Sequence, residues 1–311
     1  MFMKKNQANC AAVVVTFYPD QEIKNHISRL CSLCHTVVIV DNTPTQRFVT
    51  FPSRQNLIIH RNNSNEGLAY ALNKGVELAH DAGFENLFLL DQDTRVPLDY
   101  FKEMLDFKDR VEAVSDHCAF CVPNFYDRNS HSFARFPVVR PISFRHVTCG
   151  SFDYDMVKGV LIAITSGMLI NYQRYLEIGP FPEDYFIDFI DNDYCLKAGT
   201  KGLSIAVNCG VLIDHAIGHR RTHNLMGLQI KPSHHSPVRR YYISRNGIKT
   251  ALTFGKKHPS FAFLVGLRLI HEFISILLYE KHKKEKVAAL IIGCLHSLSG
   301  RMGRIKCKQS E

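Results

Sequence analysis

The chain has 311 residues, of which 46% are hydrophobic and 22% are charged. This composition is ordinary for a globular protein and excludes an intrinsically disordered chain, and the length allows one large domain or two. The formal net charge is +9, which favours an anionic partner such as a nucleotide, a nucleic acid or an anionic lipid. The positive charge is concentrated after residue 230.

The N-terminus and the cysteines indicate a cytosolic protein. The first ten residues are polar and lack the apolar core of a signal peptide, so the ten cysteines are expected to be reduced. Two C-x-x-C pairs, at 31–34 and 118–121, lie too far apart for a compact zinc ribbon, and haem attachment would require export. We interpret these four cysteines as small buried hydrophobic residues.

Buried strands and amphipathic helices alternate over the first 90 residues. The pattern predicts strands at 10–17, 36–40, 56–60 and 86–90, and helices at 21–33 and 67–82. This order is typical of an α/β fold with a mainly parallel sheet. Ligands of such sheets bind beyond the carboxyl ends of the strands, and polar or aromatic residues follow three of these strands.

The middle of the chain is less regular. Residues 115–160 are interpreted as loops and short strands on the acceptor side. Further strands are predicted at 160–164, 203–207 and 211–213, and further helices at 172–179 and 187–201.

The C-terminal segment is apolar and basic. The run 261–279 has nearly the length of a membrane span, but it contains charges in its middle, and each charge at a bilayer centre costs roughly 2.5–3.5 kcal/mol. We therefore expect amphipathic helices that lie in the membrane surface, with basic residues at the headgroups. The alternative is a pair of core helices. The basic residues between the two apolar runs are Lys281, Lys283, Lys284 and Lys286.

The stretch Asp91-Gln92-Asp93 ends the strand at 86–90 with two carboxylates. Such a pair can hold Mg²⁺ or Mn²⁺ and leave room for substrate phosphates, although the same residues also suit a turn or a helix N-cap. Gly67 begins the next candidate, because a glycine at a helix start lets the backbone approach a ligand and the free N–H groups suit phosphate. An ordinary N-cap is the alternative there. Asn73, in the middle of this helix, requires a polar partner.

Seven segments occur in an order that resembles glycosyltransferase family 2, most closely its bacterial rhamnosyltransferase branch. They are "VVVTFYPD", "VVIVDNTP", "NEGLAYALNKG", "LLDQDT", "TSGMLI", "FIDFIDNDYCLKAGTKG" and "DHAIGH". The resemblance covers about residues 10–250. It implies a GT-A fold, which is an α/β domain that binds a nucleotide-sugar and a divalent metal.

The resemblance also implies roles for the residues at the strand ends. Thr16 and Phe17 would border the base and the ribose, and Asp41 would hydrogen-bond the pyrimidine. Asn65 and Gly67 would position the nucleotide.

Further positions carry over from the same motifs. Asn73 would support the nucleotide-binding helix, and Asp91 with its neighbour Gln92 would face the ribose or the water shell of the metal. Asp93 would ligate Mg²⁺ or Mn²⁺, and His215 would be a further metal ligand. His219 and His223 share the spacing of a zinc-binding helix with His215, but Gly218 argues against a helix there.

The acidic cluster between 188 and 193 matches the catalytic region of the family. An inverting transfer needs one carboxylate to deprotonate the acceptor hydroxyl. Alignment on Cys195 places Asp191 at the position of this base, whereas Ile190 replaces the usual Glu. Asp188 lies one helical turn earlier and is the alternative base.

The segment 239–246 resembles an Arg-Tyr-Tyr-x-x-Arg-Asn motif of the family. Arginine suits bidentate contact with a diphosphate, so Arg240 and Arg245 are candidates for that contact. A solvated basic helix face is the alternative.

The sequence therefore predicts an inverting, metal-dependent glycosyltransferase. It would transfer L-rhamnose from dTDP-L-rhamnose to a lipid-linked saccharide in the synthesis of O-antigen or a related polysaccharide, at the cytoplasmic face of a bacterial inner membrane. Residues 1–255 would form the GT-A domain and residues 256–311 the membrane-association region, and no nucleic-acid partner is expected. The alternatives are another donor such as a UDP-hexose, a nucleotide hydrolase, or a non-enzymatic protein that binds anionic ligands.

Overall fold

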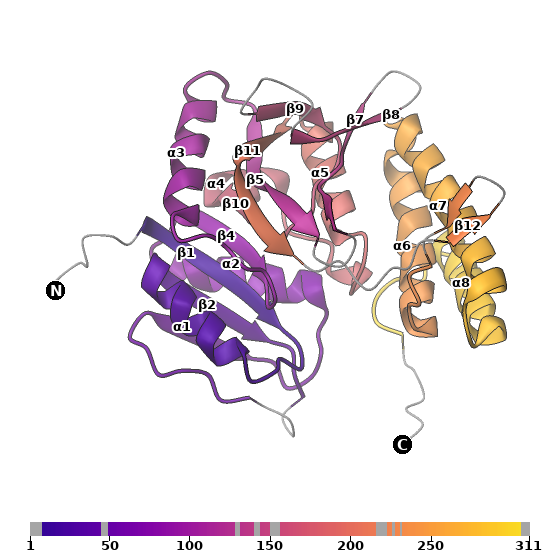
Figure 1. Ribbon diagram of the computed structural model, residues 1–311, viewed down its shortest axis with the longest axis horizontal. Coiled ribbons are helices and arrows are strands. Elements are labelled where there is room, and N and C mark those ends of the chain that lie inside the picture. Colours follow the sequence, from indigo (N-terminus) through magenta and orange to yellow (C-terminus); the bar gives the residue numbers. More distant parts are fainter. Residues whose placement is uncertain are drawn as a thin grey trace.

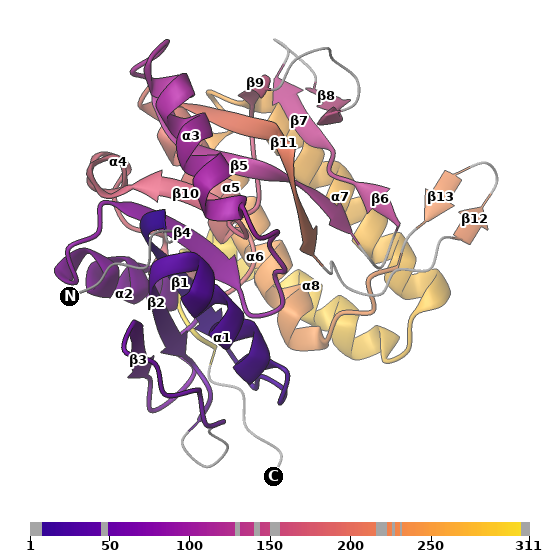
Figure 2. The same ribbon diagram turned by 60° about the vertical axis from the view of Figure 1, so that its left-hand side comes forward.

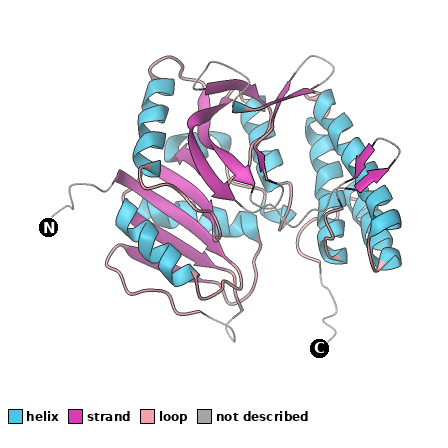
Figure 3. Cartoon of the chain, viewed as in Figure 1, coloured by secondary structure: helices cyan, strands magenta, loops and turns pink. Residues whose placement is uncertain are grey.

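The computed structural model describes residues 8–44, 49–127, 131–139, 144–149, 156–215, 223–225, 228–230 and 232–305. A large mixed sheet carries a layer of helices on each face, and further helices pack on the outer side of one of these layers (Figures 1 and 3). The strands are β1 (Ala8–Thr16), β2 (Cys34–Asp41), β3 (Leu57–Arg61), β4 (Asn86–Asp91), β5 (Cys118–Asp127), β6 (Ser132–Phe133), β7 (Phe136–Val139), β8 (Phe144–Val147), β9 (Met156–Val160), β10 (Met168–Asn171), β11 (Ser204–His215), β12 (His223–Leu225) and β13 (Leu228–Ile230). The helices are α1 (Ile23–Leu33), α2 (Leu68–Asp81), α3 (Tyr100–Glu112), α4 (Tyr172–Ile178), the 3-10 helix η3 (Glu183–Tyr185), α5 (Ile190–Thr200), α6 (Pro237–Phe254), α7 (Pro259–Tyr279) and α8 (Lys283–Leu298).

The sheet has the strand order β3-β2-β1-β4-β10-β5-β11-β9-β7-β8, with β6 paired to β5. Strands β1 to β4 are parallel to one another, and β10 runs antiparallel between β4 and β5. The predicted α/β class is confirmed. The strands β12 and β13 pair with each other and stand apart from the large sheet (Figure 2).

Two hydrophobic cores fill the two faces of the sheet. The central strands are buried on both faces, which is why their sequences are continuous apolar runs. Alternate residues of β1 and β4 point into one core with α1 and α3, and into the other with α2 and α5. Gly75 permits the close packing of α2 on β1, since a Cβ at this position would lie 2.2 Å from a methyl group of Val13.

The structure corrects several expectations from the sequence. The expected strand at 160–164 contains only Val160 as strand, and the strand that inserts between β4 and β5 is β10 instead. The expected strands at 203–207 and 211–213 are one strand, β11, with an irregularity between Asn208 and Leu212. The helix α3 was not predicted. Cys149 and Cys209 form a disulfide, so the expectation that all cysteines are reduced was wrong for this pair.

The helices α6, α7 and α8 pack together beside α5 (Figure 1). Helix α6 approaches α8 closely at Gly293, which has no side chain. A Cβ there would lie 2.5 Å from the carbonyl oxygen of Tyr241. Helix α6 was assigned to the first domain, which was expected to end at residue 255. In the structure it packs with the C-terminal extension, while the boundary itself stays a prediction.

Candidate active site

The carboxyl ends of β1, β2 and β4 form one edge of the sheet, which we call the rim. The strand register aligns Thr16 with Asp41 and Val15 with Asp91. The polar residues that interrupt these apolar strands are therefore neighbours in space. This arrangement agrees with the rule that ligands of α/β sheets bind at such edges.

Asp41 is completely buried and organises the rim. One carboxylate oxygen accepts hydrogen bonds from the Thr16 hydroxyl and the Thr43 backbone N–H, both at 3.0 Å. The other oxygen is paired with Arg61 at 3.0 Å. Thr16 is also fully buried. In this structure neither side chain is presented to a ligand, so their predicted direct contact with the nucleotide is revised to a supporting role.

Phe17 and Gln92 join the ends of β1 and β4. The backbone N–H of Phe17 donates to the side-chain oxygen of Gln92 at 2.9 Å. The Phe17 ring is 43% exposed and packs edge-on against Tyr18. An exposed aromatic pair at the rim is available to stack on a base, which is consistent with the predicted role of Phe17.

Gly67 approaches another part of the chain rather than open space. It has a φ of 94°, and a Cβ there would lie 2.7 Å from the carbonyl oxygen of Phe186. The same carbonyl accepts the Leu68 backbone N–H at 2.7 Å. The Asn65 side chain accepts the Gly67 N–H at 3.0 Å. The start of α2 is thus joined to the segment that precedes α5.

Asn73 has the polar partners that its position in α2 required. Its amide group donates to the carbonyl oxygen of Phe181 and to Glu183, and its oxygen accepts from Tyr175 and from the Phe181 N–H. The predicted supporting role fits these contacts. The residue holds α2 against residues 175–183 and does not itself face the rim.

The turn after β4 carries Asp91 and the exposed Asp93 and is tied to two other segments. The Thr94 hydroxyl bonds that of Ser166. The backbone groups of Arg95 and Asp214 exchange hydrogen bonds of 3.0 Å, which brings the end of β11 beside this turn.

His215 is the residue after Asp214 and the last residue of β11, so its backbone lies near the carboxylates. Its side chain lies outside the described residues, as does His219. In the part of the chain that the structure describes, no group of three or more His, Cys, Asp and Glu side chains could hold a metal by itself.

The segment before α5, residues 184–189, is conformationally strained; we call it the acid loop. Phe186, Asp188 and Phe189 have φ values of 66°, 63° and 64°, which cost on the order of 1–3 kcal/mol each for residues with a Cβ. Arg239 forms a fork on Asp188, with three contacts between 3.1 and 3.3 Å. Asp188 is therefore held by an ion pair, which favours Asp191 as the base.

Helix α6 holds the acid loop through buried side chains. The amide nitrogen of Asn246 donates to the carbonyl oxygens of Tyr185, Ile187 and Asp188 at 2.8–3.0 Å. Arg245 donates to three carbonyl oxygens, among them that of Tyr185, and its side chain is 0% exposed. The structure thus gives Arg245 a positioning role instead of the expected diphosphate contact.

Arg240 is likewise buried. Its guanidinium pairs with Glu272 of α7 and with Glu280, and Lys286 of α8 bonds Glu280 at 2.8 Å. These buried charges join α6, α7 and α8. The expectation that Arg240 contacts a diphosphate is corrected, and so is the alternative of a solvated basic helix face.

Asp191 lies half-buried in the first turn of α5. Burial raises the pKa of this carboxyl to about 6, and the negative charges of Asp188 and Asp91 act in the same direction. The Asn192 backbone N–H at 2.9 Å and the charge of Arg268 oppose the rise. Arg268 belongs to α7, and its guanidinium lies 5.0 Å from the ring centre of Phe189. A carboxyl with such a pKa can accept a proton near neutral pH.

The sequence reasoning missed the residues that position this site. Asn246, Arg239 and Arg268 come from helices 50 residues or more after the acid loop. No local pattern shows that these side chains reach the acid loop, although the Arg-Asn end of the 239–246 motif marked the place. Asp193 is also buried, which raises the pKa of its carboxyl to about 6, while its hydrogen bond from Tyr185 opposes the rise.

The fold and the rim with its acidic residues define a nucleotide-sugar-dependent transferase of the GT-A type. The model of the family described as Glycosyl transferase family 2 matches residues 12–174. The chain belongs to this family and is a glycosyltransferase.

Two curated relatives match almost the whole chain. The dTDP-rhamnosyl transferase RfbF of Shigella flexneri is 28% identical over 312 residues, which cover 95% of this chain and 97% of the relative. The low-salt glycan biosynthesis hexosyltransferase Agl10 of Haloferax volcanii is 20% identical over 297 residues, covering 94% and 92%.

A solved structure has the same fold. The crystal structure of GalNAc-T7 with UDP, GalNAc and Mn²⁺ matches with a TM-score of 0.52 and 13% identity. The match covers 80% of this chain and 48% of the other, so this chain spans about half the length of that protein. The likeness confirms the predicted GT-A fold.

Proposed function

We propose that this glycosyltransferase transfers L-rhamnose from dTDP-L-rhamnose to a lipid-linked saccharide, with inversion at the anomeric carbon. The similarity to a dTDP-rhamnosyl transferase over nearly the whole chain supports the donor. The observation that carries the mechanism is Asp191, a half-buried carboxyl with a pKa of about 6 next to Asp91 and Asp188. O-antigen or a related surface polysaccharide is the product that we propose.

The reaction requires a single displacement. The acceptor hydroxyl oxygen attacks the anomeric carbon, and its proton passes to the carboxylate of Asp191. The bond between the anomeric carbon and the diphosphate oxygen breaks, so the products are the glycoside and dTDP. The ion pair with Arg239 holds the side chain of Asp188 in place, while Asn246 fixes the backbone that leads into α5. No glycosyl-enzyme intermediate is needed.

The donor set at the end of β4 fits a divalent metal. Asp93 is exposed and Asp91 half-buried on one short turn, and Mg²⁺ or Mn²⁺ is commonly held by one or two carboxylates together with substrate phosphates. We propose Asp93 as the ligand, with His215 as a further one and Asp91 facing the ribose or the hydration shell. The bound ion would stabilise negative charge on the departing diphosphate.

The metal assignment can be tested by binding. Calorimetric titration of Mn²⁺ in the presence of dTDP is expected to show at least about tenfold weaker binding after Asp93→Ala. Asp99→Ala, an exposed acid eight residues from Asp91, serves as the control. Equal affinity in the wild type and Asp93→Ala would remove Asp93 from the site.

The apolar face of α7 and α8 supports association with a membrane surface. Among the described helices, α7 is long and apolar enough to cross a membrane, and 28% of its apolar window is buried. Lys286 is buried and therefore does not belong to the basic group, whereas Lys281, Lys283 and Lys284 are exposed at the end of this face. Together they suit anionic lipid headgroups. The exposed apolar residues are Phe263, Leu267, Ile270, Phe273, Ile274, Leu277, Leu278, Ile291, Ile292, Leu295 and Leu298.

The experiment for the reaction combines a donor panel with a base variant. Purified enzyme is incubated with dTDP-L-rhamnose or UDP-hexoses and a lipid-linked saccharide extract. We expect transfer from dTDP-L-rhamnose alone, and a decrease of about 100- to 10,000-fold in kcat for Asp191→Asn, with donor binding retained. Preference for a UDP-hexose would favour the alternative donor, and wild-type turnover by Asp191→Asn would refute the base.

The membrane proposal is tested by flotation with vesicles. The wild-type chain is expected to float with vesicles of phosphatidylglycerol and phosphatidylethanolamine, while a variant with Ile270→Glu and Leu277→Glu remains in the soluble fraction. Leu98→Glu and Val114→Glu, at apolar positions on the main domain that are even more exposed, provide the control. Equal flotation of both double variants would contradict the proposal.

A further inference from the structure

A pocket lies on the same face of the sheet as Asp191, two strands away from the rim carboxylates. It has a volume of about 470 Å³, which is within the range of small-molecule sites. Strands β5, β6 and β11 and the segment after β8 form its walls. The lining residues are Asn124, Ser132, Phe133, Arg135, Thr148, Cys149 and Cys209.

The strand register places this pocket level with the rim. Leu169 of β10 pairs with Phe88 of β4 on one side and with Cys121 of β5 on the other. Asp91 and Asn124 each lie three residues further along their parallel strands. Two strand spacings of about 4.8 Å therefore separate them.

The two residues also share a face of the sheet. Leu89 and Val122 belong to the same hydrophobic core, which includes α5 residues next to Asp191. Side chains two positions apart on a strand point to the same face, so Asp91 and Asn124 both point toward that side. A molecule in the pocket would lie beside the reacting groups.

Asn124 is the polar group that a ligand would satisfy. It is 7% exposed, and its side-chain oxygen has no hydrogen-bond partner among the described residues. A buried carbonyl oxygen without a partner costs about 1–3 kcal/mol, and an unsatisfied group of this kind requires an explanation. A hydroxyl group of a bound molecule would donate to this oxygen.

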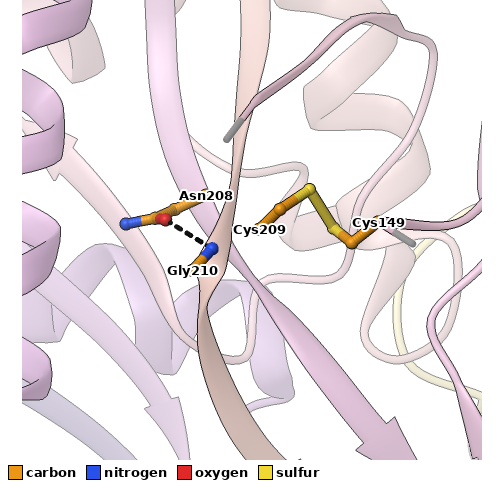
Figure 4. Close-up of a disulfide and its surroundings, with 4 residues drawn as sticks. All are labelled: Cys149, Asn208, Cys209 and Gly210. Carbon is orange, nitrogen blue, oxygen red and sulfur yellow. Dashed lines mark hydrogen bonds between the residues drawn. A yellow bond between two sulfur atoms is a disulfide. The ribbon is translucent and has the colours of Figure 1, made fainter. Parts of the chain in front are cut away.

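Phe133 supplies an apolar surface beside Asn124, because it pairs with Tyr126, which lies two positions further along β5. Its ring is 55% exposed, is held edge-on by Tyr126 with 5.4 Å between ring centres, and belongs to the β6 pairing with β5. The disulfide between Cys149 and Cys209 closes the wall (Figure 4). An aromatic ring beside hydrogen-bonding groups suits a pyranose, whose one face is apolar and whose edge carries hydroxyls.

We propose that this pocket binds a pyranose unit of the acceptor saccharide, with the ring on Phe133 and one hydroxyl donating to Asn124. Arg135 donates to the remaining sugar oxygens. The inference rests on the proposed function, since it assigns the acceptor side of that reaction. The inference extends the proposed function by naming residues that determine which acceptor sugar binds.

The probe is a set of methyl pyranosides: methyl α-L-rhamnoside, methyl α-D-glucoside and methyl N-acetyl-β-D-glucosaminide. Saturation-transfer NMR with the full chain, Mg²⁺ and dTDP reports binding without turnover. We expect at least one glycoside to bind the wild type, and its signal to fall at least about fivefold in Asn124→Leu and Phe133→Ala. Phe133→Tyr should retain it. No binding to the wild type, or unchanged signals in both variants, would overturn the proposal.

Asn86→Leu is the matched control. Its side-chain oxygen is also buried without a hydrogen-bond partner among the described residues, but it lies at the opposite end of β4, where it pairs with Asn171. It should bind the glycosides like the wild type. Phe133 is exposed, so its variants keep the test informative if Asn124→Leu fails to fold.

A separate measurement distinguishes this inference from the proposed function. Consumption of dTDP-L-rhamnose tests the donor reaction, whereas glycoside binding tests the pocket. In the transfer assay, Asn124→Leu should raise the KM for acceptor at least about tenfold and leave the KM for donor within about twofold. Equal changes in both would count against the pocket.

Discussion

The donor side of the sheet and the acid loop are held in different ways. At the rim, Asp41 is fixed by Thr16, Thr43 and Arg61, which come from the same or adjoining strands. The acid loop is held by α6, a helix about 50–60 residues further along the chain. The nucleotide side is therefore built from neighbouring strand ends, whereas the catalytic side depends on the C-terminal helices.

This difference gives the C-terminal helices a role in positioning the acid loop. Asn246, Arg245 and Arg239 keep three residues of the acid loop at positive φ, and these residues lead directly into the turn of α5 that carries Asp191. The strain is stored where geometry matters most for catalysis. Variants on the two sides should accordingly separate donor binding from turnover.

Among the variants that separate the two sides, the largest expected effect comes from removing the amide of Asn246. Asn246→Ala leaves the carbonyl oxygens of Tyr185, Ile187 and Asp188 without this donor, so the loop relaxes and Asp191 is displaced. We expect kcat to fall about 100-fold, with the KM for donor within about threefold. Thr253→Ala, on the exposed side of α6, is the control for steady-state kinetics. An increase in the KM for donor without a decrease in kcat would contradict the assignment of Asn246 to the catalytic side.

The second variant, Thr16→Val, changes the rim on the donor side of the sheet. Thr16→Val keeps the shape of a buried side chain but removes one donor to Asp41, which should shift the rim and raise the KM for donor about tenfold. The change in kcat should stay below threefold. Thr36→Val, at the far end of β2, replaces another buried threonine and should leave both parameters unchanged. A large decrease in kcat without a change in KM would show that the two sides are not separable.

Asp191 should destabilise the folded protein above pH 6. The pKa of its carboxyl is 3.8 in the reference state and about 6 in the fold, so the folded protein binds the proton more tightly, and stability decreases as the pH rises through this range. Asp191→Asn should therefore be more stable by on the order of 1 kcal/mol at pH 8 and no more stable at pH 3.5. Urea denaturation at both pH values measures this, with Asp99→Asn as the control. A gain of equal size at both pH values would rule out the ionisation of Asp191 as its cause.

The smallest expected effect is a shift in the pKa of Asp191 when the charge of Arg268 in α7 is removed. The charged groups that face Asp191 are Asp91 from β4, Asp188 from the acid loop and Arg268 from α7. Removal of the positive charge in Arg268→Ala should raise the pKa of Asp191, so the acidic limb of the kcat/KM profile should move upward by about half a unit. Arg268→Lys should restore most of the shift, and Arg301→Ala serves as an exposed control. An acidic limb that does not move would show that Arg268 of α7 has no effect on the pKa of Asp191.

The sequence was informative where structure follows from adjacent residues. Apolar runs that end in Phe17, Asp41 and Asp91 correctly predicted parallel strands with a polar edge, and the polar partner that Asn73 required is present. The burial of Arg240 could not be read, because Glu272 and Glu280 follow it by 32 and 40 positions. The pocket around Asn124 depends in the same way on strands that are distant in sequence.

The middle of the sequence illustrates the same limit. Residues 160–164 have an apolar composition typical of a strand, but only Val160 belongs to one; Gly167 at a φ of 85° turns the chain, and the next strand begins at Met168. The start of this strand follows from its place in the sheet, since β10 lies between β4 and β5 and runs antiparallel to both. Local composition specifies burial and does not specify which residues pair.

The attachment of the acid loop to α6 determines where this protein can be recombined with a relative. A chimera that exchanged only residues 256–311 would retain Asn246 but separate Arg268 from the ring of Phe189, and α8 from the surface of α6 on which it packs. A junction just before α6 would separate Asn246 from the carbonyl groups that it holds. Residues 184 to 305 should therefore be exchanged as one block, so that the C-terminal helices are introduced together with the loop that they hold.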